Sequence, residues 1–126
     1  MEGIIKLKNP IEVNGKTLTE LKYNTDKITG ALFCEADAKR RIAAGVKNVA
    51  LAPAAEFDYS LHLYMGYAAC IAANGELDFA DMERAHGADV IEIMSVGRNF
   101  MLQSEDLQQS NSDEQSEITA EHSTQA

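Results

Sequence analysis

The dipeptide Asn14–Gly15 limits the folds open to this chain more than any other local feature. Asn and Gly tolerate the positive φ angles of a two-residue type I′ turn, which joins antiparallel strands. Apolar and polar residues alternate on both sides of this turn, from Ile5 to Val13 and from Lys16 to Tyr23. The sequence therefore predicts a β-hairpin over about residues 3–23. We expect one face of its second strand to carry Thr17, Thr19, Leu21 and Tyr23.

Pro10 interrupts the first predicted strand. Proline has no backbone N–H to give to a ladder, so this strand is either at an edge or broken by a bulge near Asn9. Two strands alone are only marginally stable in water. The hairpin is therefore expected to pack against helices.

Four helices are expected after the hairpin, at about residues 26–44, 54–73, 78–85 and 88–102. Residues typical of helix ends mark these boundaries, namely Asn24–Asp26, Gly45, Pro53, Asn74–Gly75, Asp78 and His86–Gly87. The predicted fold class is α+β, with an N-terminal β-hairpin packed on a small bundle of three to four helices. Residues 1–102 form one domain in this interpretation.

Residues 103–126 are predicted to be a disordered acidic tail, because their only large apolar residues are Leu107 and Ile118. The net charge of -9 is unevenly spread, at +3 for residues 1–47 and -6 each for residues 48–102 and 103–126. An acidic chain repels polyanions, so nucleic acid is not expected as a partner. Neither a membrane-spanning stretch nor a secretory leader is evident, and Cys34 and Cys70 read as reduced thiols of a cytosolic protein.

Two predicted helices are apolar nearly all round. In the last helix only Glu92, Ser95, Arg98 and Asn99 are polar among residues 90–102. In the second, one line of the helix becomes small rather than polar along its length, which would let another helix approach closely. This line comprises Asp58, His62, Gly66, Ala69 and Ala73. Such helices are normally buried on more than one side. Either the two cross in one core with the hairpin as a lid, or some apolar surface is left for another chain, a copy or a partner helix.

Periodicity alone nominates the residues of a partner surface, which are Met65, Tyr67, Ile91, Met94, Gly97 and Met101. Methionine side chains adapt to helices of varied shape, although methionine also serves as plain core filler. No catalytic or metal-binding constellation is found. Ser95 lies mid-helix instead of on a strand-to-helix turn, the cysteines and histidines lack paired zinc spacings, and no Gly-rich phosphate loop is present. No cofactor is therefore expected.

A basic cluster ends the first predicted helix. It comprises Lys39, Arg40 and Arg41, with Lys47 nearby. Cations at this position interact favourably with the helix dipole. Alternatively, the cluster receives acidic groups from a neighbour or from the chain's own tail, an interaction that would weaken with salt.

Two segments resemble the tail assembly chaperones of contractile-tailed bacteriophages. Residues 8–21 (KNPIEVNGKTLTEL) are similar to that family's opening strand, glycine turn and Thr-x-Leu strand, and residues 72–82 (AANGELDFADM) to its helix break and Asp-bearing short helix. The chain departs from the family after Leu21, where Arg-x-Pro-Thr usually follows. The family positions matched here are Pro10, Gly15, Leu21, Gly75, Asp81 and Phe100.

The resemblance implies a non-enzymatic protein that coats helices of the tape-measure protein and keeps it soluble while the tail assembles. It also implies a location in the host bacterial cytoplasm, absence from the mature virion, and in many phages a longer frameshifted form of the same protein. Two alternatives stay open. One is a structural or adaptor subunit retained in the tail, and the other is a small acidic regulator such as an antitoxin.

Overall fold

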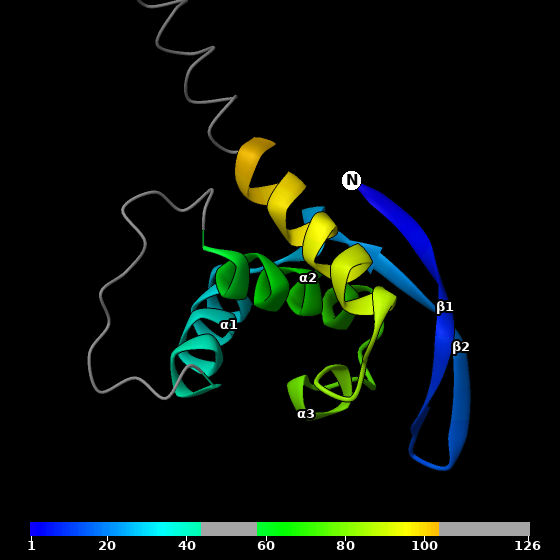
Figure 1. Cartoon of the computed structure of the whole chain (residues 1–126). Coiled ribbons are helices and arrows are strands. Elements are labelled where there is room, and N and C mark those ends of the chain that lie inside the picture. Colours follow the sequence, from blue (N-terminus) through cyan, green and yellow to red (C-terminus); the bar gives the residue numbers. More distant parts are fainter. Residues whose placement is uncertain (44–57, 104–126) are drawn as a thin grey trace, which may run out of the picture.

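The computed structural model describes residues 1–43 and 58–103. Strands β1 (Glu2–Val13) and β2 (Lys16–Asn24) form an antiparallel hairpin, followed by the 3-10 turn η1 (Thr25–Lys27). Helices α1 (Gly30–Ala43), α2 (Tyr59–Ala73) and α3 (Phe79–Met82) follow, and residues 88–103 form a further helix, here called the 88–103 helix. It lies across α2, with α1 on one side and the hairpin on the other (Figure 1). The α+β prediction is confirmed.

The hairpin has the predicted turn, and β1 is both an edge strand and irregular near Pro10, the two alternatives expected for it. Asn14 and Gly15 both have positive φ, at 53° and 77°, and Val13 pairs with Lys16 across the turn. The register shifts between Lys6 and Ile11, the stretch that contains Pro10. Residues 7–10 of β1 have no paired residue in β2, so the ladder loses no hydrogen bond at Pro10.

The bulge changes which residues of β2 face the core. Leu21 pairs opposite Ile5 and is 1% exposed, whereas Leu18 pairs opposite Ile11 and is half-buried. Both leucines thus point inward although they are three residues apart. The expectation that Thr17 and Thr19 share the face of Leu21 is wrong, since both threonines are exposed. A register change reverses the alternation of side chains along a strand.

Helix starts differ most from the prediction, because several polar residues compete to cap. The Asn24 side chain accepts the N–H of Asp26 and caps only η1, and Ile28 is then extended. The Thr29 hydroxyl accepts the N–H of Leu32, so α1 begins at Gly30 rather than near 26. Likewise the Asp58 carboxylate accepts the N–H of Leu61, and α2 begins at Tyr59 rather than at 54.

The later boundaries are closer to those expected. Helix α2 ends at Ala73 as predicted, and Asp78 with Asp81 forms a reciprocal capping box at α3. Helix α3 ends at Met82 instead of 85, and Gly87, with φ 67°, precedes the 88–103 helix. Gln103 continues that helix. The predictions for Gly45, Lys47, Pro53 and the rest of the acidic tail fall outside the described residues.

The two cysteines lie in contrasting surroundings. Cys34 is exposed on α1, whereas Cys70 is fully buried in α2, where burial raises the pKa of its thiol to about 12. Only the thiolate is an effective nucleophile. We expect iodoacetamide at pH 8 to alkylate Cys34 in the folded protein and Cys70 only after denaturation. Peptide mass mapping checks this result, and rapid labelling of Cys70 in the native protein would contradict the packing of α2.

Candidate protein-binding surface

The 88–103 helix crosses α2 in direct backbone contact. A Cβ atom on Gly97 would overlap the carbonyl oxygen of His62 and lie 2.6 Å from the backbone nitrogen of Gly66. A Cβ atom on Gly66 would overlap the carbonyl oxygen of Ile93. The small line predicted on the second helix therefore does receive another helix, and that helix belongs to the same chain.

The start of the 88–103 helix is fastened to the bulge of β1. The Asp89 carboxylate, which is fully buried, accepts the backbone N–H of Lys8 at 2.9 Å and that of Asn9 at 2.8 Å. The Asn9 side chain donates in turn to the carbonyl oxygen of His86. Asp89 thus satisfies two N–H groups that the irregular ladder leaves without a β2 partner. Sequence reasoning did not identify this residue.

The far end of the helix packs against α1. The rings of Phe100 and Phe33 have centroids 6.4 Å apart, and both side chains are half-buried. Together with the crossing and the Asp89 contact, this fixes the helix at its start, middle and end. The inner face is occupied by the protein's own core, to which Ile93 and Val96 contribute.

One flank of this helix, between its buried face and the exposed Glu92, Ser95 and Asn99, is apolar and partly accessible. Ile91 is 58% exposed, and the other members of this surface are half-buried. We call the set the outer strip: Val90, Ile91, Met94, Met101 and Leu102. Residues spaced three and four apart on a helix share a side, so Val90, Ile91 and Met94 form one apolar group. Met101 and Leu102 lie on the same side two turns later, with the exposed Arg98 between the two groups.

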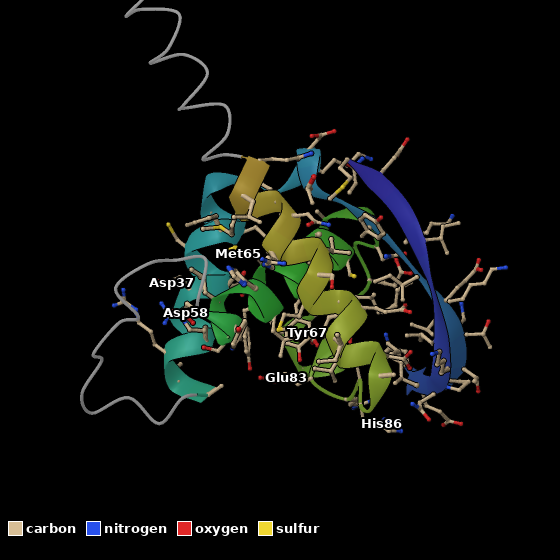
Figure 2. All side chains as sticks on the ribbon, turned by 45° about the horizontal axis from the view of Figure 1, so that its top comes forward. Asp37, Asp58, Met65, Tyr67, Glu83 and His86 are labelled. Atoms are coloured by element: carbon tan, nitrogen blue, oxygen red, sulfur yellow. The ribbon has the colours of Figure 1, made fainter. Side chains whose placement is uncertain are left out.

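The six nominated partner residues are divided between core and surface. Ile91, Met94 and Met101 belong to the outer strip. Met65 is fully buried, Tyr67 is 4% exposed, and Gly97 lies at the helix crossing, so none of these three is accessible in this conformation. Met65 and Tyr67 lie among the helices in Figure 2. Periodicity identified apolar faces but not which of them the chain covers itself.

The positions matched by the family resemblance have structural roles. Gly15 is in the turn, Leu21 is in the core and Pro10 lies in the bulge. Asp81 belongs to the capping box and Phe100 contacts Phe33, as described above. Gly75 lies in the exposed connection after α2.

Tyr64 and Tyr67 make an edge-to-face pair with ring centroids 4.8 Å apart, beside Glu83. The Tyr64 hydroxyl donates to the Glu83 carboxylate. Burial, reinforced by Glu83, raises the pKa of Tyr64 far above its usual range, and burial raises that of Tyr67 to about 12. Both hydroxyls are therefore protonated at neutral pH, and the Tyr64 hydroxyl acts as a hydrogen-bond donor rather than a base.

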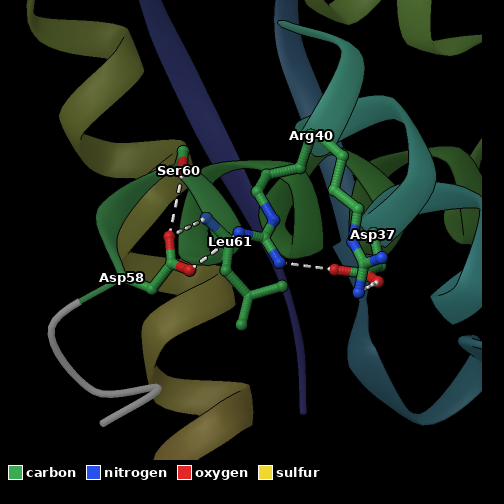
Figure 3. Close-up of polar contacts among 6 residues, drawn as sticks. Asp37, Arg40, Asp58, Ser60 and Leu61 are labelled. Carbon is green, nitrogen blue, oxygen red and sulfur yellow. Dashed lines mark hydrogen bonds and ion pairs between the residues drawn. The ribbon is translucent and has the colours of Figure 1, made fainter. Parts of the chain in front are cut away.

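Arg40, a member of the basic cluster, has a structural role. Its guanidinium bonds Asp58 at 2.9 Å and Asp37 at 2.7 Å, and its side chain is only 6% exposed (Figure 3). Asp58 at the same time caps α2 through the N–H of Leu61. Arg40 thus ties α1 to the start of α2, and its charge is already compensated.

Arg40→Met is expected to lower the free energy of unfolding by about 3 kcal/mol, because it leaves Asp58 largely buried without its cation. The matched control is Arg41→Met, which removes a half-exposed guanidinium 3.2 Å from Asp37 and should cost about 0.5 kcal/mol or less. Urea unfolding followed by circular dichroism measures both. Equal costs for the two variants would contradict this assignment.

Within residues 1–43 and 58–103, no three His, Cys, Asp or Glu side chains are grouped so that they could hold a metal ion. In the same part of the chain no helix has the length and apolar character needed to cross a membrane. The chain was also compared with protein-family models, curated proteins and solved structures, and none of the three comparisons finds a match.

Proposed function

We propose that this protein is a non-enzymatic tail assembly chaperone of a contractile-tailed bacteriophage, which binds helices of the tape-measure protein and keeps that protein soluble. The observation that carries the proposal is the outer strip, an apolar surface on a helix fixed at three points. The resemblance of residues 8–21 and 72–82 to the family adds the identity of the client.

The chemistry of the outer strip suits a helical client. An amphipathic helix presents apolar side chains at three- and four-residue spacing, and the strip offers two apolar groups on one side of a helix, one at Val90, Ile91 and Met94 and one at Met101 and Leu102. Met94 and Met101 have flexible thioether side chains that adapt to different partners along a long helical protein. The net charge of -6 over residues 48–102 would help to keep the coated complex soluble.

The proposal also includes where the protein acts. It would work in the host cytoplasm and be absent from the finished particle. A longer frameshifted form would share residues of this domain and carry the same strip. Mass spectrometry of purified particles separates the chaperone from a structural or adaptor subunit, because finding the chain at stoichiometric amounts in particles would contradict the proposal.

Co-expression with the tape-measure protein tests the proposed activity. The native chain should raise the soluble fraction of that protein several-fold, and Ile91→Asp should remove most of the gain by placing a charge in the outer strip. Ile42→Asp is the matched control, because Ile42 is 74% exposed on α1 and lies outside the strip. A client whose solubility is unchanged by the native chain, or equally changed by both variants, would overturn the proposal.

A further inference from the structure

The first half of β1 has an open edge. In the described part of the chain the sheet contains only β1 and β2, so β1 has no strand on its other side. The N–H of Thr25 bonds the carbonyl of Met1, and residues alternate along an antiparallel ladder. Odd-numbered residues therefore direct their main-chain groups to β2. The groups of Glu2, Ile4 and Lys6 point to the open edge.

This open edge has a defined length. The N–H groups of Lys8 and Asn9 are bonded to Asp89, and Pro10 has none. Main-chain pairing with a further strand therefore ends before Leu7. Edge strands are usually protected by charged side chains, proline or bulges. Here the proline and the bulge lie in the second half of β1, and the first half carries one charge of each sign, at Glu2 and Lys6.

The edge borders a groove with room for another strand. The groove has a volume of about 600 Å³ and is lined along β1 by Met1 and residues 4–8. Its other wall is the 88–103 helix, through Glu92, Ser95, Val96 and Asn99. Ile4, which also lines the groove, is 54% exposed, although it is a large apolar side chain in a strand.

The charges along this edge are self-complementary. When β1 is placed antiparallel to a second copy with Ile4 opposite Ile4, Glu2 falls opposite Lys6 at both ends of the paired segment. Opposite charges placed directly across a strand pair are favourable. The two Ile4 side chains would also cover apolar surface that is exposed to water in the monomer. A register one step further along would place Ile4 opposite Lys6 and would require the N–H of Lys8, which Asp89 already holds.

We propose that two copies of this chain associate through residues 2–6 of β1, which pair antiparallel about Ile4 to give a four-stranded sheet. The surface is separate from the outer strip, so this association does not depend on the proposed chaperone activity. Few residues pair directly, so the dimer is of the weak, concentration-dependent class.

Cross-linking tests the register. In a Cys34→Ser background, Ile4→Cys should form an intermolecular disulfide under mild oxidation, because directly opposed hydrogen-bonded residues have Cα atoms about 5.5 Å apart. Lys22→Cys is the matched control. Lys22 is exposed beside Ile4 on β2, but it would lie about 14 Å, three strand spacings, from its copy. The proposal would be overturned if Ile4→Cys formed no more intermolecular disulfide than Lys22→Cys.

Sedimentation of the full chain gives a second, independent test. The native protein should move from 13.8 kDa toward twice that mass as its concentration rises. Ile4→Pro should stay monomeric, because proline removes an N–H that points away from β2 and so leaves the hairpin intact. Circular dichroism verifies that the variant is folded. A native chain that is monomeric at about 1 mM, or an Ile4→Pro variant that associates equally, would contradict the proposed edge.

Discussion

Gly97→Ala is expected to lower the free energy of unfolding by about 3 kcal/mol or more, which is at the upper end of the cost of overpacking a core. The added Cβ would overlap the carbonyl oxygen of His62, a backbone atom that cannot move without shifting all of α2. The 88–103 helix would have to separate from α2, and the outer strip would lose its fixed position. Chemical denaturation measures the change in stability.

Gly30→Ala is the matched control for this variant. Gly30 begins α1, and a Cβ atom there would meet nothing within 4 Å. Alanine lowers the entropy of the unfolded chain and favours helix, so Gly30→Ala should be neutral or stabilising by up to about 1 kcal/mol. If Gly97→Ala were equally well tolerated, the close crossing of the two helices would be wrong.

Asp89→Ala is expected to cost about 3 kcal/mol, because two backbone N–H groups lose a charged acceptor at the same time. The effect should be local as well as global. Amide exchange at Lys8 and Asn9 should accelerate more than exchange elsewhere in β1, which hydrogen-exchange NMR can resolve.

Two further variants qualify this result. Asp89→Asn retains one acceptor oxygen and should lose roughly half as much stability as Asp89→Ala. Glu92→Ala removes an exposed carboxylate from the same helix and should change stability by less than about 0.5 kcal/mol. If Asp89→Ala left the free energy of unfolding unchanged, the bulge would be held by other contacts.

The features that the sequence predicted well are those set by neighbouring residues. Asn14–Gly15 selects its turn through its own φ preferences, and Pro10 restricts its strand to an edge or a bulge because it has no N–H to donate. The alternation in β2 was misjudged because the bulge lies on the other strand. A change of register in β1 decides which residues of β2 face inward. The residues next to Leu18 in the sequence do not indicate that change.

Helix starts were harder to predict because caps compete. Asn24, Thr29 and Asp58 are all good N-cap residues, and nothing local ranks Thr29 above Asn24 for α1. For Asp58 the tertiary structure contributes, since Arg40 approaches the same carboxylate from α1. A charge partner 18 residues away is not visible in the local pattern.

The candidate surface could be predicted only in part. The small residue Gly66 correctly indicated a close helix contact. The sequence could not tell whether the contacting helix belonged to this chain or to another. Met65 and Tyr67 are apolar in the same way as Ile91, and only the fold separates the buried pair from the exposed residue. The role of Asp89 depends on backbone groups about 80 residues away.

The distance along the chain between Asp89 and the bulge of β1 affects when the hairpin is completed during synthesis. The hairpin can form from residues 2–24 alone, but its bulge lacks two hydrogen-bond acceptors until residue 89 has been added. At elongation rates of about 5–20 residues per second, this leaves an interval of several seconds. Residues 88–103 are synthesised after the hairpin, α1 and α2, so the outer strip can take its final position only after those segments have been made.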